Sequence, residues 1–132
     1  MDRQAFLVSL FTTISVMWRH VAAAGAERQA TFTKGKFAVP ISPEAVEADW
    51  TALGYSKPKV ESYAQGWSRG EHTHPVHLIM TIVAGRMEFV FGEERYVVEP
   101  GDEIFYAANT VHSARNLYDG TTQMMEGYKP KA

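Results

Sequence analysis

Four of the five histidines of this 132-residue chain lie between residues 72 and 112. His72 and His74 are two residues apart, so on an extended strand both side chains project from the same face and can chelate a metal ion. His112 follows another predicted strand and the small-residue loop of residues 107–110, and closure of a β-barrel would bring it beside the first pair. A His-x-His pair is also found among ordinary surface and core histidines, so the surrounding spacing has to decide between the two interpretations.

The composition limits the chemistry that the chain can perform. There is no cysteine, which excludes disulfides, thiolate nucleophiles and cysteine-based zinc or iron–sulfur sites. The 13 basic residues are balanced by 15 acidic ones, a net charge of −2, so no nucleic-acid partner is expected. Hydrophobic residues make up 45% and charged residues 21%, which is typical of one globular domain. Any chemistry here must therefore use His, carboxylate, Tyr or a bound metal.

The elements that position the histidines are predicted to be strands. From residue 60 onward, short runs rich in Val, Ile, Phe and Tyr alternate with turn signals that contain glycine. This pattern predicts an all-β sandwich or barrel. No run is long enough for the crossover helices of a parallel α/β sheet, so that class is rejected.

The first third of the chain has a different pattern. Apolar residues recur at spacings of three and four over residues 5–21, which predicts an amphipathic helix that docks on the domain or on a second subunit. The alternative is a secretory signal peptide within residues 1–24. The stretch is too short and too polar to span a bilayer. Residues 25–41 are expected to be a connecting segment or an edge strand, and Ser42, Pro43 and Glu44 predict the start of a short helix. We divide the chain into a segment 1–41 and a barrel domain 42–132.

Two blocks of residues in the β region resemble the two motifs of the cupin family. The first block has the expected intervals at Gly66, His72, His74 and Gly85. The second block matches at Gly101, His112 and Asn116. The resemblance covers roughly residues 58–128 and implies a cupin double-stranded β-helix, or jelly-roll barrel, preceded by an N-terminal helical extension.

Carried over residue by residue, the resemblance implies that His72, His74 and His112 are metal ligands. Three neutral imidazoles suit Fe, Ni, Mn, Cu or Zn without deciding between them. The glutamate ligand of the family falls on Leu78, so the usual fourth protein ligand is absent. His77 is one residue away, and a local bulge near Pro75 could turn it inward as a fourth ligand; the alternative is a surface or interface histidine.

Other residues of the predicted strands are candidates for acid–base catalysis or for the wall of a pocket. The candidate catalytic residues are Tyr106 and Glu126. The candidate pocket residues are Tyr63, Trp67, Leu78, Met80, Met87 and Tyr128. The ordinary interpretation of such residues is core or rim packing, which is the alternative for each of them. Arg69, Arg86 and Arg115 are candidate anchors for a carboxylate, or else solvated surface residues.

These observations lead to a prediction of function. We expect a metal-dependent enzyme acting on a small organic substrate, with oxygenase chemistry favoured and lyase or isomerase chemistry as alternatives. The competing hypothesis is a non-catalytic cupin that binds a small ligand or has a structural role. A homodimer is expected because the apolar stripe of residues 5–21 needs burial. The expected location is the cytoplasm, or the periplasm if residues 1–24 act as a signal peptide.

Overall fold

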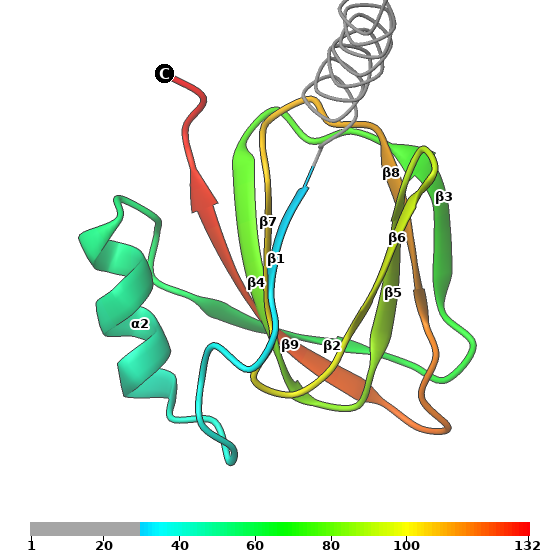
Figure 1. Cartoon of the computed structure of the whole chain (residues 1–132), viewed down its shortest axis with the longest axis horizontal. Helices are drawn as coiled ribbons and strands as arrows, with labels where there is room; N and C mark the ends of the chain where they lie inside the picture. The colour runs from blue at the N-terminus through cyan, green and yellow to red at the C-terminus, as the bar shows by residue number, and fades with distance from the viewer. Residues whose placement is uncertain (1–29) are drawn as a thin grey trace, which may run out of the picture.

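The computed structural model describes residues 30–132, which form two antiparallel sheets that face each other (Figure 1). The larger sheet has the order β1-β7-β4-β9-β2 and the smaller sheet the order β3-β8-β5-β6. The elements in chain order are β1 (Ala30–Thr33), α2 (Pro43–Ala52), β2 (Lys59–Tyr63), β3 (Ser68–His72), β4 (His77–Ala84), β5 (Met87–Phe91), β6 (Glu94–Val98), β7 (Glu103–Tyr106), β8 (His112–Asn116) and β9 (Thr122–Lys129). The predicted all-β barrel is confirmed.

Several predictions about the first third of the chain fall on residues 1–29. The amphipathic helix of residues 5–21 and the alternative signal peptide lie outside the described residues. For residues 25–41, an edge strand is confirmed at Ala30–Thr33, because β1 begins the strand order of the larger sheet and pairs with β7. The domain division at residue 42 and the homodimer stay predictions. Within residues 30–132, no helix is long and apolar enough to cross a membrane.

Helix α2 begins where the sequence predicts. The Ser42 hydroxyl caps it by accepting a hydrogen bond from the Ala45 backbone N–H at 3.2 Å, and proline occupies its first turn. Val46 and Trp50 are buried against the larger sheet. Leu53, three residues after Trp50, is 51% exposed although helical spacing would place it on the same apolar face. It lies at the C-terminal cap, where the chain turns away from the helix axis at Gly54, so it no longer follows the helical period.

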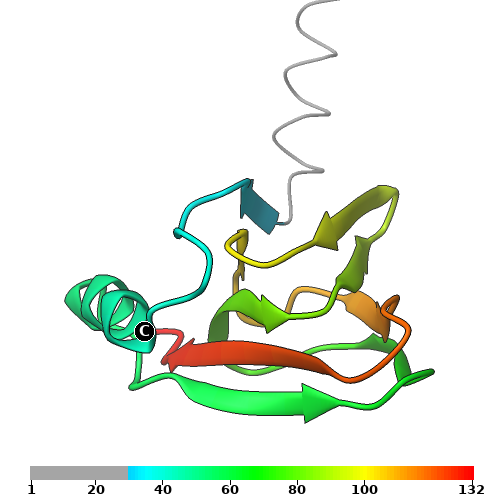
Figure 2. The ribbon, with the colours of Figure 1, turned by 90° about the horizontal axis from the view of Figure 1, so that it is seen from below.

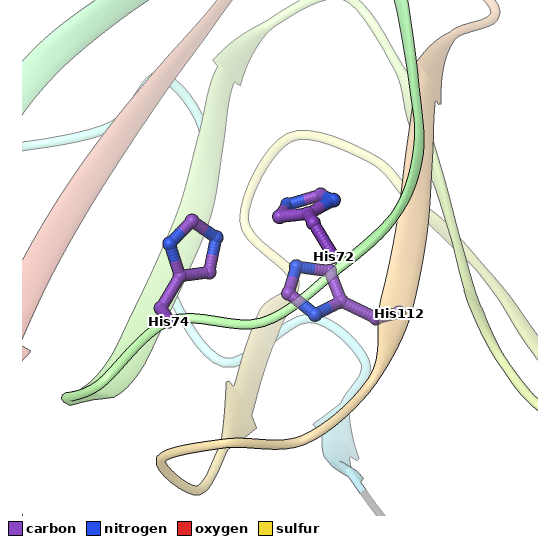
Figure 3. Close-up of side chains that lie close together, drawn as sticks. All are labelled: His72, His74 and His112. Atoms are coloured by element: carbon purple, nitrogen blue, oxygen red, sulfur yellow. The ribbon is translucent and has the colours of Figure 1, made fainter.

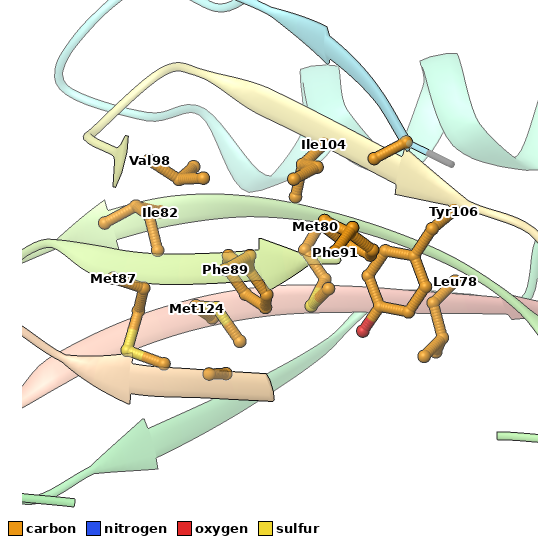
Figure 4. Packing of buried hydrophobic residues seen from close by; sticks show 12 residues of the cluster. Leu78, Met80, Ile82, Met87, Phe89, Phe91, Val98, Ile104, Tyr106 and Met124 are labelled. Atoms are coloured by element: carbon orange, nitrogen blue, oxygen red, sulfur yellow. The ribbon is translucent and has the colours of Figure 1, made fainter. Parts of the chain in front are cut away.

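Strand β4 is buried on both faces, although strands of an antiparallel barrel commonly have one face in solvent. Its inward side chains, Leu78, Met80 and Ile82, join the barrel core drawn in Figure 4. On the opposite face Ile79 packs with Trp50 beneath α2, which lies outside the larger sheet (Figure 2). The Trp50 indole N–H donates to a Glu103 carboxylate oxygen at 2.8 Å, and this bond holds the helix over the sheet. Helix and strand therefore support each other from outside the barrel.

Two residues of the cupin-like motifs, Asn116 and Gly85, have a structural role and do not belong to the histidine cluster. Asn116 donates to the carbonyl oxygens of Tyr63, Ala64 and Gly120, and so ties together loops at one end of the barrel. Gly85 has φ +101°, and a Cβ atom built on it would lie 2.2 Å from the Thr122 hydroxyl oxygen. Only glycine fits this position.

Replacing Gly85 by alanine should therefore destabilise the barrel more than an ordinary glycine substitution. We expect Gly85→Ala to lower the free energy of unfolding by about 2–4 kcal/mol, since backbone strain and overpacking add. Gly92→Ala is the matched control: Gly92 also has a positive φ (+62°), but nothing lies within 4 Å of its Cβ position. Its cost should be about 1 kcal/mol. Urea denaturation measures both, and equal losses would contradict the close approach to Thr122.

Candidate metal site

The side chains of His72, His74 and His112 come together at one end of the barrel (Figure 3). One ligand nitrogen from each residue can be chosen so that all three lie within 4.8 Å of one another. The ring centroids of His72 and His112 are 4.2 Å apart, and His74 lies 4.8 and 5.2 Å from them. His72 ends β3 directly opposite His112, which begins β8. Strand pairing thus brings together two of the three residues.

His74 reaches the cluster by a different route from the one that the sequence suggests. We expected one extended strand to carry both His72 and His74, but β3 ends at His72 and residues 73–76 are irregular. The His74 backbone is held instead by the Asn109 N–H, which donates to its carbonyl oxygen at 2.7 Å. Asn109 has φ +64°, a conformation that asparagine tolerates better than most residues. The loop before β8 therefore positions the third imidazole.

The hydrogen bonds of two imidazoles leave a ligand atom free. His72 Nδ1 lies 2.7 Å from the Gly70 carbonyl oxygen, and His112 Nδ1 lies 2.9 Å from the Thr110 carbonyl oxygen. A carbonyl oxygen only accepts, so each Nδ1 must carry the proton and each Nε2 keeps its lone pair. Backbone carbonyls commonly orient metal-binding histidines in this way. The donor set fits a divalent transition ion.

Burial keeps the imidazoles of His74 and His112 neutral. It is the main cause that lowers the pKa of His112 to about 4, and the neighbouring His72 and His74 add to the effect. The pKa of His74 is also lowered, again first by burial and then by the charge of His72. Metal ligation requires deprotonated imidazole, so protons compete weakly with a metal at neutral pH.

The cluster faces a cavity of about 170 Å³ that is open to solvent on one side. A cavity of about 150 Å³ holds a molecule the size of benzene. All of the candidate catalytic and pocket residues line it together with the three histidines: Tyr63, Trp67, Leu78, Met80, Met87, Tyr106, Glu126 and Tyr128. The structure thus brings together side chains from both sheets.

Among the candidate metal ligands, His77 is the one that the structure leaves outside the cavity. It does not line the cavity, and its Nδ1 accepts a hydrogen bond from the Ala108 N–H at 2.9 Å. The ring centroids of His77 and Phe105 are 6.2 Å apart. In β4 it precedes Leu78, whose side chain faces the barrel interior, so His77 lies on the opposite face of a regular strand.

Four further residues line the cavity that were not among the predicted pocket residues: Arg69, Phe89, Ala114 and Met124. Three of them could have been found by alternation, since each lies two residues from a predicted site residue on the same strand: Phe89 from Met87, Ala114 from His112 and Met124 from Glu126. Arg69 could not. The pairing of β3 with β8 shifts between Arg69 and His72, where two residues of β3, Gly70 and Glu71, lie opposite one residue of β8, Ser113.

A carboxylate lies in the cavity on the strand next to Leu78. Glu126 of β9 pairs with Met80, and Tyr128 pairs with Leu78. The Tyr63 hydroxyl donates to one oxygen of Glu126, and the Tyr128 hydroxyl donates to the other at 3.3 Å. Burial raises the pKa of Glu126, even though the hydrogen bond from Tyr63 opposes the shift. Burial also raises the pKa of Tyr63 and of Tyr128, so both keep their protons.

Tyr106 contributes a different kind of group. The centroid of its ring lies 4.4 Å from the ring centroid of His112, and burial raises the pKa of its hydroxyl. Within residues 30–132 this hydroxyl has no hydrogen-bond partner. It is therefore available to a bound molecule.

The lowered histidine pKa values predict how the metal-free protein responds to acid. Below pH 6.5 the unfolded chain takes up a proton at His112 that the folded chain refuses until about pH 4, so stability is lost as pH falls through this window. We expect the metal-free protein to lose up to about 2 kcal/mol through this residue between pH 7 and pH 5. Urea denaturation at both pH values measures the loss.

The variant His112→Gln should show a smaller loss over this pH range, whereas His77→Gln should behave like the unsubstituted protein. The pairwise comparison removes the contribution of groups common to all three proteins. An identical pH response in His112→Gln would contradict the lowered pKa.

Comparison with known proteins agrees with this architecture. The model of the cupin domain matches residues 59–128, more than half of the chain. A cupin superfamily protein of Desulfitobacterium hafniense is 17% identical with a TM-score of 0.50, over 79% of this chain and 80% of that protein. A protein of Bacillus halodurans is 20% identical with a TM-score of 0.52, over 58% and 63% of the two chains.

A structure of the DMSP lyase DddQ of Ruegeria pomeroyi is 28% identical with a TM-score of 0.48, over 53% of this chain and 36% of the lyase. The chain thus spans less than two thirds of the Bacillus protein and about a third of the lyase. A search of curated proteins found no match. The family motif, the two facing sheets and the matched domain lead to one conclusion: the chain belongs to the cupin family.

Proposed function

We propose that this cupin is a metal-dependent enzyme that acts on a small organic substrate through the three-histidine cluster. The observation that carries the proposal is the position of the cluster on a cavity that also contains a hydrogen-bonded carboxyl group. Imidazoles with free Nε2 atoms would hold Fe, Ni, Mn, Cu or Zn. When bound, such an ion supplies Lewis acidity, and iron or copper also supplies redox chemistry.

Glu126 is the best candidate for moving a proton. Its pKa is raised mainly by burial, which brings the carboxyl group closer to the operating pH than an ordinary glutamate. The hydroxyls of Tyr63 and Tyr128 fix the orientation of its two oxygens. Tyr106 offers a hydroxyl beside His112 that can hydrogen-bond to a substrate oxygen.

The carboxyl group of Glu126 favours a different reaction class from the one that we expect from the sequence. An oxygenase, which we favour from the sequence, depends on redox chemistry and does not need a carboxyl group in the cavity. A lyase or isomerase depends on removing a proton from carbon and needs a base there. We therefore propose proton-transfer chemistry first and oxygenase chemistry as the alternative. Methionine and aromatic walls of Met80, Met87, Phe89 and Met124 suit a substrate with an apolar part.

A non-catalytic cupin remains the second candidate function. The observation that favours it is Leu78, which is buried and lines the cavity at the position where the family has its glutamate ligand. Without that ligand the cluster carries one negative charge less and would hold a metal less tightly. In this case the cavity would bind a small molecule without turnover.

Metal content separates the two functions. Elemental analysis of untagged protein from metal-replete cells should find close to one Fe, Ni, Mn, Cu or Zn per chain. His112→Ala and His74→Ala should lose that metal, while His77→Ala, a histidine outside the cluster, should keep it. Circular dichroism shows whether each variant is folded. No metal in the unsubstituted protein after reconstitution, or equal metal in all variants, would contradict the enzyme.

Glu126→Gln should abolish proton transfer without removing the metal. We would follow a panel of small carbon acids by proton NMR in D₂O with metal-loaded protein, and expect exchange or elimination at one C–H position. Loss of a general base reduces such rates by about 100-fold or more. Tyr63→Phe keeps the carboxyl group but removes one hydrogen bond, so its loss should be smaller. Conversion that requires dioxygen and persists in Glu126→Gln would favour the oxygenase instead.

A further inference from the structure

Arg69 differs from the other arginines in the described part of the chain. Arg95 and Arg115 both form ion pairs with Glu88, and Arg86 donates to the Leu117 carbonyl oxygen at 3.4 Å. Within residues 30–132 the Arg69 guanidinium has neither a hydrogen-bond nor an ion-pair partner. It lines the cavity of the histidine cluster and is at the same time exposed, so it lies where the cavity opens to solvent.

The positive charge of Arg69 affects the pKa of groups inside the barrel. Arg69 also borders a shallow groove on the outer face of the smaller sheet, where Glu88 lies. Its charge acts on the interior groups His74, His112 and Tyr106, although burial is the main cause of the pKa shift at each of them. At Glu88, by contrast, burial acts to raise the pKa, but the hydrogen bonds and charges of Arg95 and Arg115 outweigh it and lower the pKa; Arg69 is not among the causes. The guanidinium therefore belongs electrostatically to the cavity.

The cavity lacks negative charge to balance this guanidinium. Among the described residues that line it, Glu126 is the single carboxylate, and both of its oxygens accept hydrogen bonds from tyrosine hydroxyls. Leu78 contributes none at the position of the family's glutamate. A divalent ion on three neutral imidazoles would add two further positive charges. An anionic molecule bound in the cavity would balance this positive charge.

We infer that Arg69 binds the carboxylate of a small organic acid, and that this acid is the substrate class of the proposed enzyme. A guanidinium binds a carboxylate through two parallel hydrogen bonds, a geometry that neither lysine nor glutamine can reproduce. The apolar part of the acid lies against the methionine and aromatic wall, and the volume of about 170 Å³ limits it to about the size of a benzene ring. The inference rests on the proposed function, because it assigns the molecule on which the metal and Glu126 act.

Binding of matched probes tests this inference without any need for turnover. Benzoate and butanoate are compared with the neutral benzamide and butanamide by isothermal titration calorimetry, using the full chain both metal-loaded and metal-free. Both carboxylates should bind more tightly than their amides, and dodecanoate, which exceeds the cavity, should bind no better than butanoate. Arg69→Gln should weaken benzoate binding by about 10- to 100-fold, with Arg69→Lys in between.

Arg86→Gln is the matched control, because Arg86 does not line the cavity, and it should leave benzoate binding unchanged. Metal content measured on the same samples should be equal in all of these proteins. Equal affinity for carboxylate and amide, equal affinity in Arg69→Gln and the unsubstituted chain, or no binding of either carboxylate at millimolar concentration would overturn the inference. Arg69-dependent carboxylate binding in a protein that takes up no metal would support it while overturning the metal-dependent enzyme.

Discussion

The pairing of β3 with β8 is the constraint on which the functional end of the barrel depends. It places His72 opposite His112, and the ring of His112 packs in turn against Tyr106 from the larger sheet. One extra residue in β3 lets Arg69 and His72 share the inward face, although their spacing in a regular strand would separate them. A straight strand would keep the histidine pair and send the arginine to the outside.

The carboxyl group of the cavity does not stand at the position where the cupin family has its glutamate ligand. The family's position for a carboxylate ligand holds Leu78, and the carboxylate that lines the cavity comes instead from Glu126 on the neighbouring strand. Two tyrosine hydroxyls bind Glu126, and burial raises its pKa. The carboxyl group is thereby better suited to accept or donate a proton than to neutralise a metal. In the proposed enzyme, the imidazoles that would hold the metal are therefore separate from the group that would transfer the proton.

The outer layer of the molecule supports this arrangement from behind. Helix α2 buries the outer face of β4, whose inner face carries Leu78 and Met80 into the cavity (Figures 1 and 2). Because β4 is fixed on both faces, its register with β9 is strongly specified, and the positions of Glu126 and Tyr128 are specified with it. Packing that is remote from the cavity thus orients the groups that line it.

Much of this could be predicted from the residues alone. Alternation of apolar residues and glycine turns predicts the barrel, the cupin-like spacing indicates the three histidines, and period-two patterning could have found Phe89 and Met124. The sequence by itself determined which chemistry is available: imidazole, carboxyl and phenol, and no thiol. Only the tertiary structure decided that His77 faces outward, that a loop rather than a strand carries His74, and that Arg69 faces the cavity. These outcomes depend on a bulge and on contacts between distant strands, and such contacts leave no local period in the sequence.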